Sequence, residues 1–258
     1  MSPLPVRRSA LEAVHARLGA RWRSEQERWP VSYGDVEGES RALRDGIALA
    51  EPGPYDKLIV RGASIIADLR WLGFSARPGE LLPARSLDGV NVWTLAADEA
   101  TLVRSAGAAA TTSAPAAVGP EGSLSEIAGK LRSAGLSVVD VGSAYTVFRL
   151  VGPNLPFLLQ ELCPVDLSDR SVPDLRVVQA PFGGTRVVLA RRDHGELPGF
   201  ILLVVRDEAE FLWEVIVHLG EAHGLRPVGA MAIRPPFPAE ATAAATTPGA
   251  PVTEVRAR

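Results

Sequence analysis

The chain has 258 residues and a formal net charge of -3, and hydrophobic residues make up 47% of it. This length fits one large domain or two small ones, and the composition is that of an ordinary folded protein. Nucleic acid is excluded as the main partner, because phosphate binding needs a surplus of clustered basic residues. A single cysteine, Cys163, excludes an intrachain disulfide and a cysteine-rich zinc site.

Membrane insertion is not expected either. The sequence has no run of the ~20 apolar residues that a membrane-spanning helix needs. Its first residues lack an apolar segment of signal-peptide length. We therefore expect a cytoplasmic protein with no membrane partner.

The first half of the chain predicts a strand, a helix and a strand pair, in that order. Residues 57–62 form a β-type run that ends in glycine. A helical stretch follows, with Ile65 and Leu69 on one face. The runs 90–95 and 100–103 then predict the strand pair.

The same order recurs in the second half. Residues 145–151 predict a strand, and residues 154–162 predict a short helix with a proline in its first turn. Residues 185–190 and 199–205 predict two further strands. The recurrence indicates an internal duplication, in which two small α+β units pair their sheets around one core.

Two amphipathic helices and two unstructured stretches complete the prediction. The helices are expected at 123–134 and 207–223, with Trp213 on the buried stripe of the second. Residues 105–122 are rich in Ala, Thr, Pro and Gly and predict a flexible linker. Residues 235–258 lack periodic apolar positions and predict a disordered tail.

Few residues suggest chemistry by themselves. His218 and His223 are five residues apart and so do not share a helix face, which leaves no expected metal site. His15 is expected to be a surface or capping residue. Cys163 has apolar neighbours and is expected to be buried and inert. The pair 183–184 predicts a glycine hairpin turn rather than a phosphate loop.

Short motifs between residues 11 and 232 nevertheless follow one another in a recognisable order. They lie at 11–20, 29–35, 44–49, 57–62, 199–200, 212–214 and 224–229. Their collinear order resembles the aminomethyltransferase (T-protein) family of the glycine cleavage system, which includes folate domains of dimethylglycine and sarcosine oxidases. The second half also resembles the gamma subunit of heterotetrameric sarcosine oxidase, through the motifs at 139–141, 150–153, 162–167 and 198–200.

The resemblance implies an α+β fold of two similar ferredoxin-like halves around a central folate cavity, without the C-terminal barrel of the full transferases. It agrees with the duplication inferred above. We therefore expect one folate-binding-type domain over residues 1–234, with halves at about 11–104 and 123–234 joined by the linker.

The resemblance also implies positions for the site. The second acid of the family's Asp-Asp-Leu run falls on Gly89, which leaves Asp88 as the candidate catalytic residue. The family's acid after Gly-Phe, which holds the pterin ring, falls on Ile201, and a family arginine falls on Ile233. Loss of a carboxylate partner costs roughly 1–3 kcal/mol of pterin binding. The candidate cofactor-binding residues are Tyr33, Trp93, Phe200 and Arg234.

These departures leave more than one function open. The favoured hypothesis is a non-catalytic subunit or scaffold, packed against a larger flavin-dependent amine oxidase subunit or assembled with copies of itself. The alternative is a diverged tetrahydrofolate-dependent transferase of aminomethyl or methyl groups. A domain adapted to another small ligand is a third hypothesis. Tetrahydrofolate is the cofactor that the resemblance implies, and its retention is left open.

Overall fold

The computed structural model of the chain describes residues 7–25, 27–71, 74, 76–83, 90–105 and 124–233. The expected linker lies outside these residues except at its first position, Ser105, and so does the expected tail at 235–258. Asp88, Gly89 and Arg234 also lie outside them.

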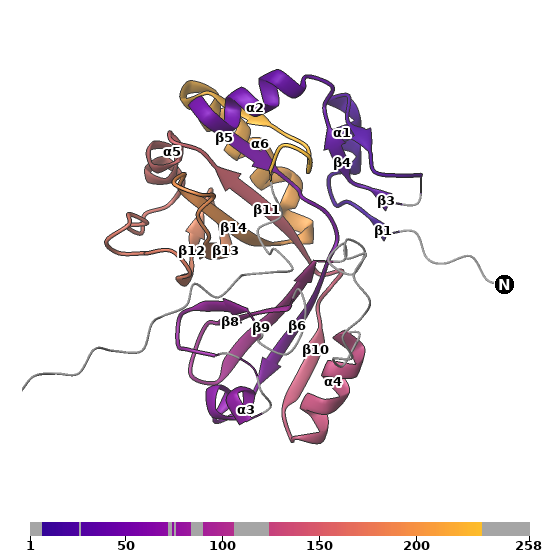
Figure 1. Cartoon of the computed structure of the whole chain (residues 1–258), viewed down its shortest axis with the longest axis vertical. Helices are drawn as coiled ribbons and strands as arrows, with labels where there is room; N and C mark the ends of the chain where they lie inside the picture. The colour runs from indigo at the N-terminus through magenta and orange to yellow at the C-terminus, as the bar shows by residue number, and fades with distance from the viewer. Residues whose placement is uncertain are drawn as a thin grey trace, which may run out of the picture.

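Two β-sheets lie one above the other in Figure 1. The five-stranded sheet consists, in spatial order, of β10 (Ser137–Asp140), β6 (Tyr55–Arg61), β9 (Glu99–Ser105), β8 (Val90–Thr94) and β7 (Leu81–Pro83). The six-stranded sheet consists of β12 (Val177–Phe182), β13 (Thr185–Arg191), β14 (Gly199–Val205), β11 (Tyr145–Val151), β5 (Ile47–Ala50) and β15 (Leu225–Pro227).

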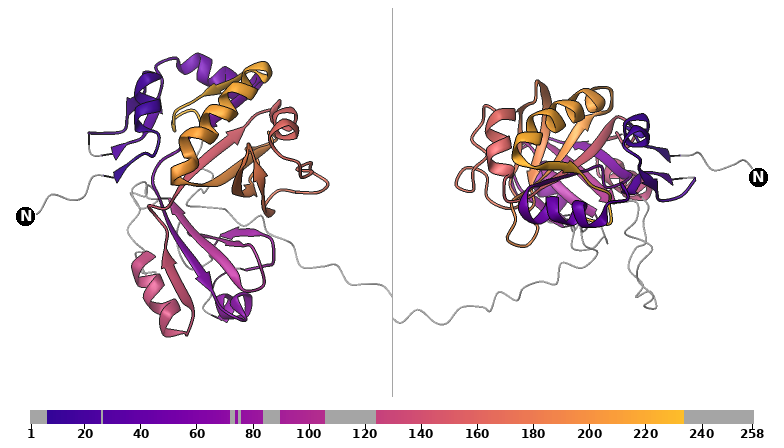
Figure 2. Two further views of the ribbon diagram at one scale, coloured as in Figure 1. Left: turned by 180° about the vertical axis from the view of Figure 1, so that it is seen from behind. Right: turned by 90° about the horizontal axis from the view of Figure 1, so that it is seen from above.

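Helices cover the outer face of each sheet (Figure 2). Helices α3 (Ile65–Trp71) and α4 (Leu124–Ser133) share one hydrophobic cluster with strands of the five-stranded sheet. Helices α5 (Leu155–Leu162) and α6 (Ala209–Gly220) share another with strands of the six-stranded sheet. Short 3-10 turns, η1 (Arg206–Glu208) and η2 (Glu221–His223), extend α6 at its two ends.

The N-terminal region packs on both faces of the six-stranded sheet. It contains α1 (Glu12–Arg17), α2 (Val36–Asp45), the parallel pair β1 (Arg7–Arg8) and β3 (Glu27–Arg28), and the antiparallel pair β2 (Arg21–Trp22) and β4 (Pro30–Ser32). Leu11 and Val14 join the cluster that contains α6. Ala42 of α2 packs against Ala48 and Ala50 of β5 on the opposite face.

The five-stranded sheet is built from one continuous stretch of chain, residues 55–140, which lies between β5 and β11 in the sequence. The predicted halves therefore do not map onto the sheets one to one. Helix α4 and β10, from the predicted second half, complete the five-stranded sheet. Strand β5, from the predicted first half, lies inside the six-stranded sheet, antiparallel to β11 and parallel to β15.

Most predicted elements are confirmed, but one residue is misplaced. The strand predicted at 145–151 is β11, and the glycines at 183–184 form the β12–β13 turn with φ values of 57° and 88°. His15 is fully buried, so the expectation of a surface or capping residue was wrong. A histidine can be buried where partners for both ring nitrogens are present, and those partners are described below.

Trp213 of α6 packs against the six-stranded sheet and against α1, as expected of a residue on the buried stripe. It is 1% exposed, and its ring lies 5.4 Å from that of Phe148 and 5.1 Å from that of His15 in edge-to-face geometry. Trp213→Ala should lower the free energy of unfolding by about 3–5 kcal/mol, because it leaves a cavity in the core. Urea denaturation followed by circular dichroism measures this. The exposed neighbour Glu214→Ala is the control and should leave the unfolding midpoint nearly unchanged.

Candidate functional site

The two sheets face each other across a buried layer, which we call the inter-sheet layer. Side chains alternate along each strand, so one face of β6, β8, β9, β11, β13 and β14 meets the helices and the other meets this layer. The layer comprises Tyr55, Lys57, Asn91, Trp93, Thr101 and Val103 from the five-stranded sheet and Val147, Arg149, Val177, Ala190, Ile201 and Leu203 from the six-stranded sheet.

Arg149 is the feature of this layer that stands out chemically. Its side chain is 1% exposed, and among the described residues its Nε and Nη1 atoms have no hydrogen-bond partner. Burial lowers the pKa of its guanidinium to about 10, with smaller effects from neighbouring charges that include Tyr55. Arg149 therefore remains a cation at neutral pH, with donors that the surrounding protein does not satisfy.

The two acidic side chains that affect the pKa of Arg149 already accept hydrogen bonds from other groups. Both carboxylate oxygens of Asp193 accept bonds from Arg191, at 2.9 and 3.1 Å. Asp174 accepts from the backbone N–H of Asp193 at 2.9 Å and from Arg192 at 3.4 Å. The second buried cation of the layer, Lys57, donates to the backbone carbonyl of Tyr55 at 2.9 Å.

Ile201 lies directly opposite Arg149 in the β11–β14 ladder. It is fully buried and belongs to the hydrophobic cluster of the layer. Gly199, at the start of β14, makes room for the guanidinium, since a Cβ there would lie 3.0 Å from Arg149 Nη2 and 2.6 Å from the carbonyl oxygen of Arg192. The strand pair thus presents a cation and an apolar side chain at adjacent positions.

A buried polar network lies on the other side of the six-stranded sheet. Glu51 is 1% exposed, and its Oε2 accepts from His15 Nε2 at 2.9 Å and from the Ser9 hydroxyl. Its Oε1 accepts from the Thr146 hydroxyl at 2.5 Å. With the His15 proton assigned to Nε2 from these partners, Nδ1 accepts from the Tyr33 hydroxyl, the two atoms lying 2.8 Å apart. The network joins the N-terminal region to β11.

A second carboxylate, Glu39 of α2, continues the network toward the C-terminal end. One of its oxygens accepts from the backbone N–H of Tyr33 at 2.6 Å and the other from that of Gly229 at 2.8 Å. Burial, followed by the charges of Glu51 and Glu39, raises the pKa of the Tyr33 phenol above its usual value. Every polar contact here lies within the protein, so the network fits a structural role.

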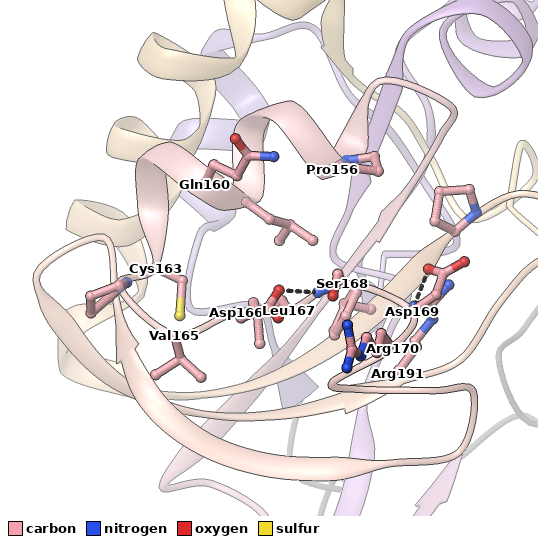
Figure 3. Close-up of a pocket in the computed structure, with 14 residues that line it drawn as sticks. Pro156, Gln160, Cys163, Val165, Asp166, Leu167, Ser168, Asp169, Arg170 and Arg191 are labelled. Carbon is pink, nitrogen blue, oxygen red and sulfur yellow. Dashed lines mark hydrogen bonds and ion pairs between the residues drawn. The ribbon is translucent and has the colours of Figure 1, made fainter.

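A pocket of about 720 Å³ lies between α5 and the loop that follows it (Figure 3). Arg191 lines it and is 4% exposed. Its guanidinium is paired with Asp193 and, at 2.5 Å, with Asp169, and it donates to the Val172 carbonyl at 3.0 Å. Cys163 also lines the pocket, and burial raises the pKa of its thiol. The buried cation of this pocket has its partners, unlike Arg149.

The three predicted cofactor-binding residues that the structure describes lie in separate environments. Trp93 lies in the inter-sheet layer and is fully buried. Tyr33 belongs to the His15 network, and Phe200 lines the pocket beside α5, on the opposite face of β14 from Ile201. Asp88 and Arg234 lie outside the described residues.

Sequence reasoning missed Arg149 and the pairing of His15 with Glu51. The sequence contained a signal for Arg149, because one charged residue interrupts the run YTVFRLV, which is otherwise almost wholly apolar on both faces. Charged residues are almost never fully buried unless they are paired. The His15–Glu51 contact joins residues 36 positions apart, and no local pattern predicts it.

Comparison with a known protein family matches most of this fold. The model of the GCVT N-terminal domain family matches residues 88–235, which is more than half of the chain. The aminomethyltransferase of Saccharopolyspora erythraea is 27% identical over 241 residues, which cover 86% of this chain and 60% of that protein. The aminomethyltransferase of Streptomyces coelicolor is 26% identical over 243 residues, which cover 89% and 61%. The chain thus spans about 60% of the length of these curated relatives.

Two solved structures share the fold. The glycine cleavage system aminomethyltransferase T of Bartonella henselae superposes with a TM-score of 0.63 at 18% identity, covering 88% of this chain and 60% of that chain. A chain of the heterotetrameric sarcosine oxidase of Corynebacterium sp. U-96 superposes with a TM-score of 0.58 at 20% identity, covering 84% and 96%.

Two further observations concern metal ions and membranes. The described residues contain no group of three or more His, Cys, Asp or Glu side chains arranged to hold a metal ion. None of their helices has the length and hydropathy needed to cross a membrane.

The raised pKa of Tyr33 predicts how stability changes in alkaline solution. In the unfolded chain the phenol ionises near pH 10, whereas in the folded protein it stays protonated. Its contribution to stability is therefore complete below about pH 10 and is lost as the pH rises further. Urea midpoints measured at about pH 8 to 11 should fall more steeply for the wild type than for Tyr33→Phe. Equal slopes for the two proteins would contradict this assignment.

Proposed function

This chain belongs to the GCVT N-terminal domain family, and from that premise we propose that it is a non-catalytic, aminomethyltransferase-like subunit of an amine-oxidising complex. The observation that carries the proposal is Ile201, a fully buried apolar residue at the position where the family resemblance expects the pterin-holding acid. Loss of the carboxylate partner of the pterin costs roughly 1–3 kcal/mol of binding. Loss of polar side chains from such positions favours a scaffold over a transferase.

The second apolar replacement supports the same conclusion. Ile233, at the position that the resemblance assigns to a family arginine, is 1% exposed and packs with Val151 and Val228. A residue in this environment stabilises the fold and has no polar group to offer a ligand. Both changes replace a charged side chain with core packing.

Tetrahydrofolate, the cofactor implied by the family, does not fit the described residues of the inter-sheet layer. Its pterin carries N–H donors that a carboxylate would accept, and the buried carboxylates among the described residues are Glu39 and Glu51. Both belong to the network on the N-terminal side, where protein donors occupy them. The described side chains of the layer offer the donors of Arg149 and Lys57 and neutral polar groups such as Asn91 and Thr101, but no carboxylate. This mismatch favours a role that does not involve a folate-dependent step.

The fold itself supports descent from a duplicated ferredoxin-like unit. Residues 55–140 follow the order β6-α3-β7-β8-β9-α4-β10, with the spatial order β7-β8-β9-β6-β10. The later stretch follows β11-α5-β12-β13-β14-α6-β15, with the spatial order β12-β13-β14-β11-β5-β15. The two patterns agree once β5 is recognised as an inserted strand, and without the edge strands β7 and β12 each has the β-α-β-β-α-β succession.

The partner that we propose is a larger flavin-dependent amine oxidase subunit. The likeness to a chain of a heterotetrameric sarcosine oxidase suggests this kind of assembly. The outer surface of α5 and α6 offers a place for contact, because Phe157 is 58% exposed and Phe211 is 55% exposed. Exposed aromatic residues on neighbouring helices are typical of protein interfaces. The alternative is that a second copy of this chain binds the same surface.

The isolated chain should not transfer aminomethyl or methyl groups to tetrahydrofolate. The reason is the loss of charge at Ile201 and Ile233, together with the glycine at position 89. The assay measures methylenetetrahydrofolate or methyltetrahydrofolate formed from tetrahydrofolate and a suitable donor. Turnover in the wild type that Asp88→Asn abolishes would overturn the non-catalytic proposal and identify Asp88 as the catalytic residue.

Co-expression with a flavin-dependent amine oxidase of the same organism tests the partner. The two chains should elute together in size-exclusion chromatography, with the absorbance of the flavin in the shared peak. Phe157→Glu combined with Phe211→Glu should weaken the complex at least about tenfold, since each charge replaces buried apolar contact. Val139→Glu, at another exposed apolar residue, is the matched control. Separate elution of the wild-type chain, alone or as its own oligomer, would contradict the proposed partner.

A further inference from the structure

We propose that the inter-sheet layer binds the carboxylate of a small, otherwise apolar molecule, and that Arg149 is the residue that holds it. This inference goes beyond a subunit role, because it gives the chain a ligand of its own. It rests on the charge and burial of the layer and does not require that the chain have a partner protein.

The guanidinium of Arg149 is charged and incompletely hydrogen-bonded. A pKa near 10 keeps Arg149 charged at neutral pH, and its Nε and Nη1 atoms are buried without acceptors among the described residues. Buried polar atoms of native proteins are almost always hydrogen-bonded, and a buried charge without a partner is strongly destabilising. A group that brings its own oxygen acceptors would remove this penalty.

The acidic side chains of the described residues near Arg149 are bound to other donors. The acids that influence Arg149 are Asp193 and Asp174, and each is bound by other donors. Ile201, its neighbour across the ladder, has no polar atom in its side chain. Within the described part of the layer, Nε and Nη1 of this buried cation therefore have no anionic partner.

The single guanidinium and its apolar surroundings indicate the class of ligand. A carboxylate supplies two oxygens and a single negative charge, which matches one guanidinium. The remainder of the layer is mainly apolar and aromatic, with Val147, Leu203 and Trp93 all buried. Such surroundings suit a flat or branched hydrocarbon body and disfavour a phosphate, because some of its oxygens would lie against apolar side chains without a hydrogen-bond donor.

The experiment measures thermal unfolding with benzoate as the probe, at constant ionic strength. Benzamide, which has the same shape without the charge, and inorganic phosphate are the comparison compounds. Benzoate at about ten times its Kd should raise the Tm of the wild type by about 3–5 °C, because it binds the folded state alone. Benzamide and phosphate should raise it by less than about 1 °C.

Variants test whether Arg149 itself is responsible for the response to benzoate. Arg149→Met should raise the Tm without ligand, because it removes a buried unpaired charge, and should abolish the benzoate response. Arg149→Lys should keep a weaker response, and Arg41→Met, at an exposed arginine of α2, should respond like the wild type. Loss of stability in Arg149→Met, or a benzoate response that this variant retains, would overturn the assignment.

The comparison of the three compounds on the wild type is an independent test that uses no variant. Equal stabilisation by benzoate and benzamide would show that charge plays no part. Equal stabilisation by benzoate and phosphate would show that the site takes any oxyanion, which contradicts the proposed class. No stabilisation by benzoate at any concentration up to the salt limit of the assay would overturn the proposal outright.

Discussion

Strand β11 is buried on both of its faces, and the organisation of the molecule depends on that constraint. Its even-numbered residues, such as Phe148, meet the cluster beneath α5 and α6, while Val147 and Arg149 face the other sheet. A strand so placed has no solvent-facing side on which to carry a charge. The guanidinium of Arg149 is thus retained in the interior at a cost in stability, as is typical of residues kept for binding rather than folding.

Two of the buried polar regions in the described part of the chain differ in whether their charge has partners. Around Glu51, hydroxyl and imidazole groups converge on the carboxylate and satisfy it, so that region is complete without a ligand. At Arg149, by contrast, two guanidinium nitrogens have no acceptor among the described residues. The difference between a satisfied and an unsatisfied buried charge distinguishes a structural network from a candidate binding site more clearly than burial alone.

Local pattern predicted the elements well and their tertiary partners poorly. The alternation and turn residues around β11, β13 and β14 placed these strands within a residue of their bounds, because both signals are local. The same pattern could not show that β5 would insert beside β11, or that Glu51 would bind His15, since these contacts join distant segments. Trp93 lies in the inter-sheet layer, whereas Tyr33 and Phe200 lie in two other environments, and this difference depends on the packing of whole sheets.

The nested arrangement of the two sheets has a consequence for synthesis on the ribosome. Residues 55–140 contain every strand of the five-stranded sheet, so this sheet can close while the remainder of the chain is still being translated. Strand β5 emerges earlier, yet its neighbours β11 and β15 come later, the last of them at residues 225–227. The apolar strand Ile47–Ala50 must therefore wait for β11, at residues 145–151, before it can pair at all, and its second edge stays open until β15 has been made. That segment is where a chaperone would be needed most during translation.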